Sequence, residues 1–197
     1  MDIPKLSLSL GQVAWSLNFG QPPPRYMLDK LNYLRQLGIP FPKEKRAGRG
    51  NRVIYGYDDL IECGVALYAL NNGMNPVDIR KILANQRTYV RKIYRQALRE
   101  QPAAALSQDW IKSRGQIIPI LGHELFLRLH DRYSETPWKI DVMDMDDVAK
   151  EGIEYLFDPV ERYISGPSRR LVSLTRLALQ WTAWALEAPE FRTGPKG

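Results

Sequence analysis

The chain has 197 residues, of which 44% are hydrophobic and 10% aromatic, enough for a substantial core. Its single cysteine, Cys63, excludes an internal disulfide and a cysteine-based metal site, so we expect a small buried thiol in a reducing compartment. The sequence opens without a secretory signal pattern and has no apolar run near the roughly 20 residues that span a bilayer. We therefore expect a cytoplasmic protein without a membrane partner.

The net charge of +6 is unevenly distributed. Residues 1–100 hold 16 lysines and arginines against 8 aspartates and glutamates, a net charge of +8, whereas residues 101–197 have a net charge of −2. This asymmetry indicates that the first half binds a polyanion, although acidic lipid or protein partners fit a basic surface equally well.

Two helices are predicted first. The first extends to about Phe19, because apolar residues recur there at spacings of three, four and seven, and Ser9 is its expected cap. After a turn and three prolines, the last of which suits a first helical turn, a second helix spans Arg25–Leu37 with a stripe of leucines. Gly38 and Pro40 end it.

The pattern then changes to short extended pieces between Phe41 and Tyr57, joined by a glycine- and arginine-rich tip at residues 43–52. Val53, Ile54 and Tyr55 supply β-branched and aromatic residues for a returning strand. We predict a β-hairpin here.

Two further helices follow, Leu60–Asn71 capped by Asp58 or Asp59, and Val77 to about Leu98 opened by Asn75-Pro76. Pro102 marks a boundary between a DNA-binding domain (1–100) and a helical dimerisation or regulatory domain (101–197). In the second domain we expect helices near 107–112, 117–133, 146–164 and 168–186, and a short extended piece at 138–142. The apolar stripe of the last helix fits a core better than a dimer seam.

The expected fold class is mainly α: a winged helix-turn-helix domain with a small β-hairpin wing, followed by a helical C-terminal domain. In such a domain a helix enters the major groove and a basic wing lies on the backbone or the minor groove. Residues 8–85 resemble the MerR-like family of transcriptional regulators in three segments, Leu31–Pro40, Arg52–Leu60 and Gly73–Leu83. The resemblance implies a DNA-binding regulator that distorts its promoter.

The residues expected to bind DNA fall in two groups. Those on the second helix, on the side opposite the leucines, are Arg25, Tyr26, Lys30 and Tyr33. Those in the arginine-rich tip are Lys43, Lys45, Arg46, Arg49, Asn51 and Arg52.

Other patterns favour simpler interpretations. A basic ridge on the helix from Val77 is formed by Arg80, Arg87, Arg91 and Arg95. It could follow the DNA backbone or face an acidic partner, but we slightly favour a solvated helix face. His123 and His130, seven residues apart, lack the spacing of a zinc site. The acidic run Asp141, Asp144, Asp146 and Asp147 lacks the glycine and final glutamate of a calcium loop. We expect neither a metal nor a cofactor, and no enzymatic activity.

The sequence thus predicts a homodimeric, sequence-specific regulator of transcription that binds double-stranded DNA. Three alternatives stay open: an accessory factor of a phage, plasmid or mobile element, acting in excision, partition or replication; a metal-dependent nuclease using the carboxylates of residues 141–147; and a helical module that binds an acidic protein.

Overall fold

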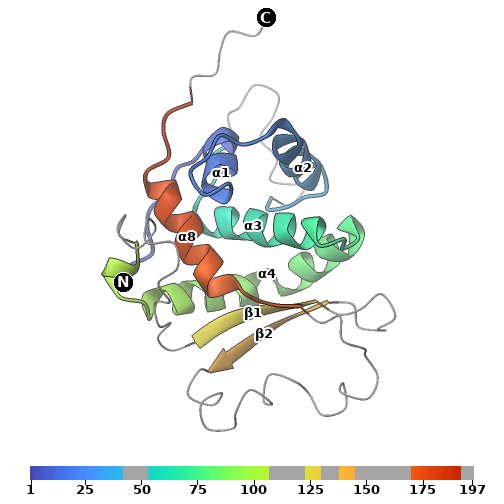
Figure 1. Ribbon diagram of the computed structural model, residues 1–197. Helices are drawn as coiled ribbons and strands as arrows, with labels where there is room; N and C mark the ends of the chain where they lie inside the picture. Colours follow the sequence, from blue (N-terminus) through green and yellow to red (C-terminus); the bar gives the residue numbers. More distant parts are fainter. Residues whose placement is uncertain (42–52, 107–122, 130–137, 145–169, 192–197) are drawn as a thin grey trace, which may run out of the picture.

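Figure 1 shows the computed structural model of the chain, which describes residues 1–41, 53–106, 123–129, 138–144 and 170–191. Within these ranges four helices come first, and a small sheet and a last helix follow. In chain order the elements are α1 (Leu10–Leu17), α2 (Arg25–Gln36), α3 (Tyr57–Asn71), α4 (Pro76–Arg99), the 3-10 turn η2 (Ala103–Leu106), β1 (His123–Leu129), β2 (Trp138–Asp144), β3 (Arg170–Ser173) and α8 (Leu174–Leu186).

The starts of three of the first helices follow local capping chemistry. The Ser9 hydroxyl accepts from the backbone N–H of Gln12, whose side chain in turn accepts from the Ser9 N–H, which confirms the predicted cap of α1. The Asn75 side chain likewise accepts from the N–H of Val77, ahead of α4. The helix α3 begins at Tyr57, earlier than predicted, because the Asp59 carboxylate reaches back from the first turn to the N–H of Gly56 at 2.9 Å.

Two glycines follow helix ends, and Gly38 does so as the sequence predicts. Gly38 and Gly73 have φ angles of +90° and +87°, a left-handed conformation that glycine adopts without strain. After α2, the Gly38 N–H donates to the Arg35 carbonyl and the Ile39 N–H to the Leu34 carbonyl, both at 3.0 Å. This pair of hydrogen bonds is a Schellman motif, and it satisfies carbonyls that the end of the helix leaves without partners.

The last helix packs back onto the first ones. Figure 1 shows α8 beside α1 and α3, it also contacts α4, and Ala178, Trp181 and Ala185 are at most 5% exposed. The Trp184 ring meets the ring of Trp15 on α1 edge-on, with 5.4 Å between ring centres. These three residues of the apolar stripe therefore lie in the core, as predicted. The core that they join is formed by helices from the first half of the sequence.

A three-stranded antiparallel sheet lies beside α4 and α8, in the order β2-β1-β3. The predicted extended piece near Trp138 is confirmed as β2. The helices predicted across 117–133 and 168–186 are wrong at 123–129 and 170–173, which are strands β1 and β3. In β1 the leucines at 125, 127 and 129 alternate with other residues, a period of two that a strand requires and that the helical interpretation overlooked.

The predicted fold class is wrong, both in its β-hairpin wing and in its helical C-terminal domain, which contains a three-stranded sheet. Within the described residues of the first half, no β-hairpin is present, and Val53–Tyr55 does not form a strand. Instead Tyr55 makes a single antiparallel bridge with Leu8, through backbone hydrogen bonds of 3.0 and 2.9 Å. Strand propensity depends on context, and here the backbone partner comes from the N-terminal segment.

Several predicted features lie outside the described residues: the tip at 43–52 and the helices near 107–112 and 146–164. Over the residues that are described, no helix has both the length and the apolar character needed to cross a bilayer.

Candidate nucleic-acid interface

The helix α2 has one buried and one exposed face. Met27, Leu31 and Leu34 are at most 6% exposed and pack in the core with residues of α1 and α3. On the other side, Tyr26 is 63% and Tyr33 44% exposed, values high for large aromatic side chains. Since a helix whose inner face is held by the core can present its outer face to a groove, the outer face of α2 is the candidate interface.

One cation on this side of α2, Lys30, is positioned by a neighbouring amide group and a ring. Lys30 Nζ donates to Asn71 Oδ1 of α3 at 2.6 Å and lies 5.6 Å from the centre of the Tyr26 ring. Arg25 is exposed at the first residue of α2. The structure thus places all four α2 residues that the sequence predicts for DNA binding on one helix: Arg25, Tyr26 and Tyr33 are exposed, and Lys30 is half-buried.

The other predicted DNA-binding residues, Lys43, Lys45, Arg46, Arg49, Asn51 and Arg52, lie outside the described residues. The residues on either side of this segment are packed together, because the ring centres of Phe41 and Tyr55 are 5.2 Å apart. Tyr55 is 1% exposed, and its burial raises the pKa of the phenol to about 12. Phe41 and Tyr55, which flank the arginine-rich stretch in the sequence, therefore pack on each other at the core.

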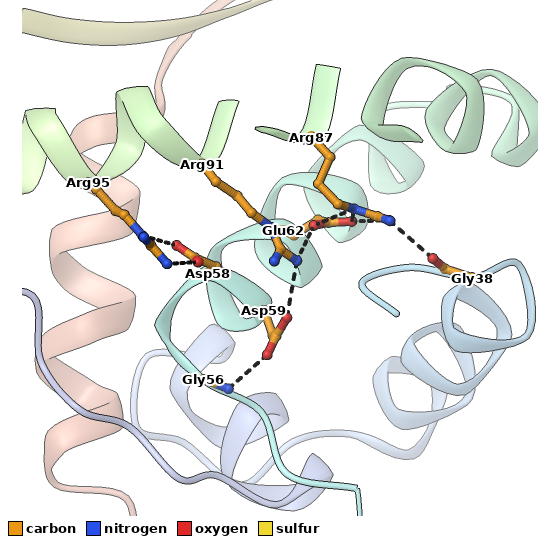
Figure 2. Close-up of polar contacts among 8 residues, drawn as sticks. All are labelled: Gly38, Gly56, Asp58, Asp59, Glu62, Arg87, Arg91 and Arg95. Carbon is orange, nitrogen blue, oxygen red and sulfur yellow. Dashed lines mark hydrogen bonds and ion pairs between the residues drawn. The ribbon is translucent and has the colours of Figure 1, made fainter. Parts of the chain in front are cut away.

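Three arginines of α4 pair with three acidic residues of α3, and we call these six residues the α3–α4 ion-pair cluster (Figure 2). Arg87 binds both carboxylate oxygens of Glu62, with its shortest contact at 2.6 Å. Arg91 donates to Asp59 at 3.2 Å and to Glu62 at 3.0 Å. Arg95 binds both oxygens of Asp58, with Nε to Oδ1 at 3.0 Å.

Glu62 lies at the centre of this cluster and is 5% exposed. Burial raises the pKa of its carboxyl group above the ordinary value, an effect that the hydrogen bonds and charges of Arg87 and Arg91 oppose. Burial likewise raises the pKa of Asp59, opposed by the N–H of Gly56 and by Arg91. A buried carboxylate is stable only when hydrogen bonds and opposite charges offset the loss of solvent, and Arg87 and Arg91 supply these to the acidic residues of α3.

This pairing changes the meaning of the basic ridge predicted on α4. Arg87, Arg91 and Arg95 face the acidic residues of α3 within the same chain, so this part of the ridge forms intramolecular ion pairs and is not a free surface for a polyanion. Arg80, the fourth residue of the ridge, is exposed. The solvent face of α4 carries Lys81, Lys92 and Arg99 as further exposed cations.

Two residue sets that the sequence analysis argued against as metal sites lie only partly within the described residues. His123 is the first residue of β1, where it pairs in register with Asp144 of β2, and Asp141 also lies on β2. His130, Asp146 and Asp147 fall outside the described residues. Among the residues that are described, no three histidine, cysteine or carboxylate side chains gather where they could hold a metal ion.

The predicted burial of Cys63 is confirmed at 3% exposure. Burial, with lesser contributions from Glu62 and Asp59, raises the pKa of the thiol well above its ordinary value.

Sequence reasoning missed the role of Glu62 and that of Gly38, whose carbonyl oxygen accepts from Arg87 Nη2 at 3.2 Å. The sequence does contain a pattern that indicates the role of Glu62. Asp58 and Asp59 precede Glu62 by four and three residues, spacings that share one side of a helix, and Arg87, Arg91 and Arg95 of α4 recur every four residues. Two helices joined by a short turn pack antiparallel, which brings such rows together. The contact to Gly38 has no comparable signal in the sequence.

A comparison with protein-family models finds none that matches this chain, and a comparison with curated proteins finds no match either.

Proposed function

We propose that this protein binds double-stranded DNA sequence-specifically and regulates transcription, with the exposed face of α2 in the major groove. The observation that carries the proposal is the row of Arg25, Tyr26, Lys30 and Tyr33 on a helix whose opposite face is fixed in the core. Arginine and lysine contact phosphates, and tyrosine hydroxyls and lysine ammonium groups donate to phosphates or base edges.

The charge balance leaves cations available on this surface and on others. The first 100 residues have a net charge of +8, and the α3–α4 ion-pair cluster cancels three positive against three negative charges within it. The excess positive charge therefore resides elsewhere, on α2, on the solvent face of α4 and in the sequence between Phe41 and Val53. The ten residues 43–52 carry five cations and one glutamate, and their contact with phosphates stays a prediction from the sequence.

The regulatory role rests on the resemblance of residues 8–85 to MerR-like regulators. A homodimer belongs to the same proposal, because small DNA-binding modules gain specificity from two linked half-sites.

The test is selection of bound sequences from a random double-stranded DNA pool, repeated at two salt concentrations. We expect one enriched sequence, with two half-sites about one helical turn apart if the protein binds as a dimer. Enrichment of a site that lies at promoters supports the regulator, whereas a site at an origin or attachment sequence supports the accessory factor. The absence of any enriched sequence, with binding abolished at modest salt, contradicts the proposal.

Two matched variants then locate the interface. Arg25→Gln/Lys30→Gln removes two cations from α2, and Lys92→Gln/Arg99→Gln removes two exposed cations from the end of α4 that lies away from α2 in Figure 1. The α2 variant is expected to reduce the slope of log affinity against log salt by about 0.9 for each phosphate that it no longer neutralises. Equally weakened binding in both variants would show that the protein binds DNA through diffuse charge and not through α2.

A further inference from the structure

Arg87 joins three helices at one point (Figure 2). From α4 its guanidinium binds the Glu62 carboxylate of α3 through Nε and Nη2, and the same Nη2 donates to the carbonyl oxygen of Gly38 at 3.2 Å. Gly38 follows the last turn of α2. The other two arginines of the α3–α4 ion-pair cluster donate to the carboxylates of α3, whereas Arg87 also reaches the end of α2.

The bond to Gly38 constrains the direction of α2, because Gly38 is rigidly joined to that helix. Its N–H and that of Ile39 close the last turn onto Arg35 and Leu34, so a movement of Gly38 moves the end of the helix. Gly38 itself is buried. One polar contact of α2 with α3, from Lys30 to Asn71, is exposed to solvent and is correspondingly weaker.

We propose that Arg87 is a positioning residue for DNA recognition: by holding Gly38 against Glu62 it fixes the angle at which the outer face of α2 enters the groove, without touching DNA itself. This inference rests on the proposed function of α2. Its physical basis is that base contacts demand accurate geometry, whereas phosphate contacts through flexible cations tolerate small displacements. Arg87 has a side chain only 18% exposed, in keeping with an internal role.

Positioning and direct contact predict different salt behaviour. In Arg87→Gln we expect the preference for the selected sequence over unrelated DNA to fall about tenfold, the scale of one charge-assisted hydrogen bond. The salt slope is expected to stay unchanged, because every phosphate contact is retained. Arg95→Gln is the matched control: it removes the same charge from the same helix, and Arg95 pairs with Asp58 away from α2, so both quantities are expected to stay as in the parent protein.

Two further variants separate positioning from general loss of structure. Arg87→Lys keeps a positive charge beside Glu62, but a single ammonium group does not reproduce the bidentate geometry together with the bond to Gly38. Glu62→Gln/Arg87→Gln removes both charges, so no buried carboxylate loses an arginine partner. Both are expected to fold and to show the same decrease in sequence preference, together with faster hydrogen exchange at the amides of Gly38 and Ile39.

The outcomes distinguish this inference from the function on which it rests. If the parent protein enriches no sequence, the proposed function fails and the inference fails with it. If the parent protein enriches a sequence and folded Arg87 variants keep the full preference, the inference alone is overturned. A smaller salt slope in Arg87→Gln but not in Arg95→Gln would also overturn it, because Arg87 would then bind a phosphate directly.

Discussion

Gly64 of α3 lies directly against the indole of Trp181 on α8: a Cβ atom at residue 64 would be 2.3 Å from Cζ3 of Trp181 and within 2.7 Å of two further ring atoms. Such distances are shorter than any real contact, and Trp181 is 4% exposed and tightly enclosed. A glycine in the middle of a helix usually weakens it, so its presence here has a packing reason. It lets α8 approach α3.

Gly64→Ala is therefore expected to destabilise the protein, although alanine favours helix more than glycine does. Overpacking costs about 1–3 kcal/mol in a well-packed core, against a gain in helix propensity of up to about 1 kcal/mol. The free energy of unfolding, measured with urea, should fall. Gly56→Ala is the control, since a Cβ there meets only Asp59 at an ordinary 3.6 Å. A Gly64→Ala protein as stable as its parent would show that α8 does not pack on α3 in this way.

The α3–α4 ion-pair cluster is expected to contribute unequally to stability. Arg87→Ala leaves the buried Glu62 with Arg91 alone and should cost about 3 kcal/mol, as breaking a buried ion pair does. Arg95→Ala should cost less, about 1 kcal/mol, because the Arg95 side chain is 50% exposed to solvent, although that of Asp58 is only 12% exposed. Urea unfolding of the two variants measures the difference. Similar costs for both would contradict the central place of Glu62.

The thiol of Cys63 is expected to be inert in the native protein. Burial raises its pKa, so the native state keeps the neutral form while the unfolded chain ionises. The free energy of unfolding should consequently fall as pH rises above about 8.5, the ordinary thiol pKa. A thiol reagent at about pH 8 should label Cys63 only in proportion to unfolding. Thr88→Cys in a Cys63→Ala background provides an exposed thiol as control, and equally fast labelling of both would count against the buried site.

The buried tyrosines predict a loss of stability in alkali. Burial raises the pKa of Tyr55 to about 12 and also raises that of Tyr57. Between about pH 10 and pH 12 the unfolded phenol releases its proton and the native one retains it, so rising pH favours unfolding by up to about 1.4 kcal/mol per pH unit for each group. Urea unfolding at several pH values checks this, and Tyr55→Phe should show a smaller slope. An unchanged slope would mean that Tyr55 ionises normally in the native state.

Local chemistry made much of the first half predictable. The caps at Ser9 and Asn75 and the stops at Gly38 and Gly73 mark helix ends through contacts within a few residues, which a single sequence displays directly. The outer face of α2 was predictable for the same reason, because helical periodicity separates its exposed residues from the leucines.

Predictions failed where the outcome depends on a distant partner. The segment Val53–Tyr55 has the composition of a strand, but Leu8 takes its backbone hydrogen bonds. Residues 123–129 pair with β2 and β3 instead of coiling into a helix. Short apolar stretches fit either state, and the neighbours that each segment meets decide between them.

By itself, the sequence determined where the helices of the first half begin and end, the burial of Cys63 and the composition of the exposed face of α2, because these follow from capping, periodicity and hydrophobicity. Only the tertiary structure decided that α8 returns to pack on Gly64, that the arginines of α4 neutralise the acids of α3, and that Arg87 reaches Gly38. Those contacts join residues between 25 and 117 positions apart, and their formation depends on how all the helices pack together.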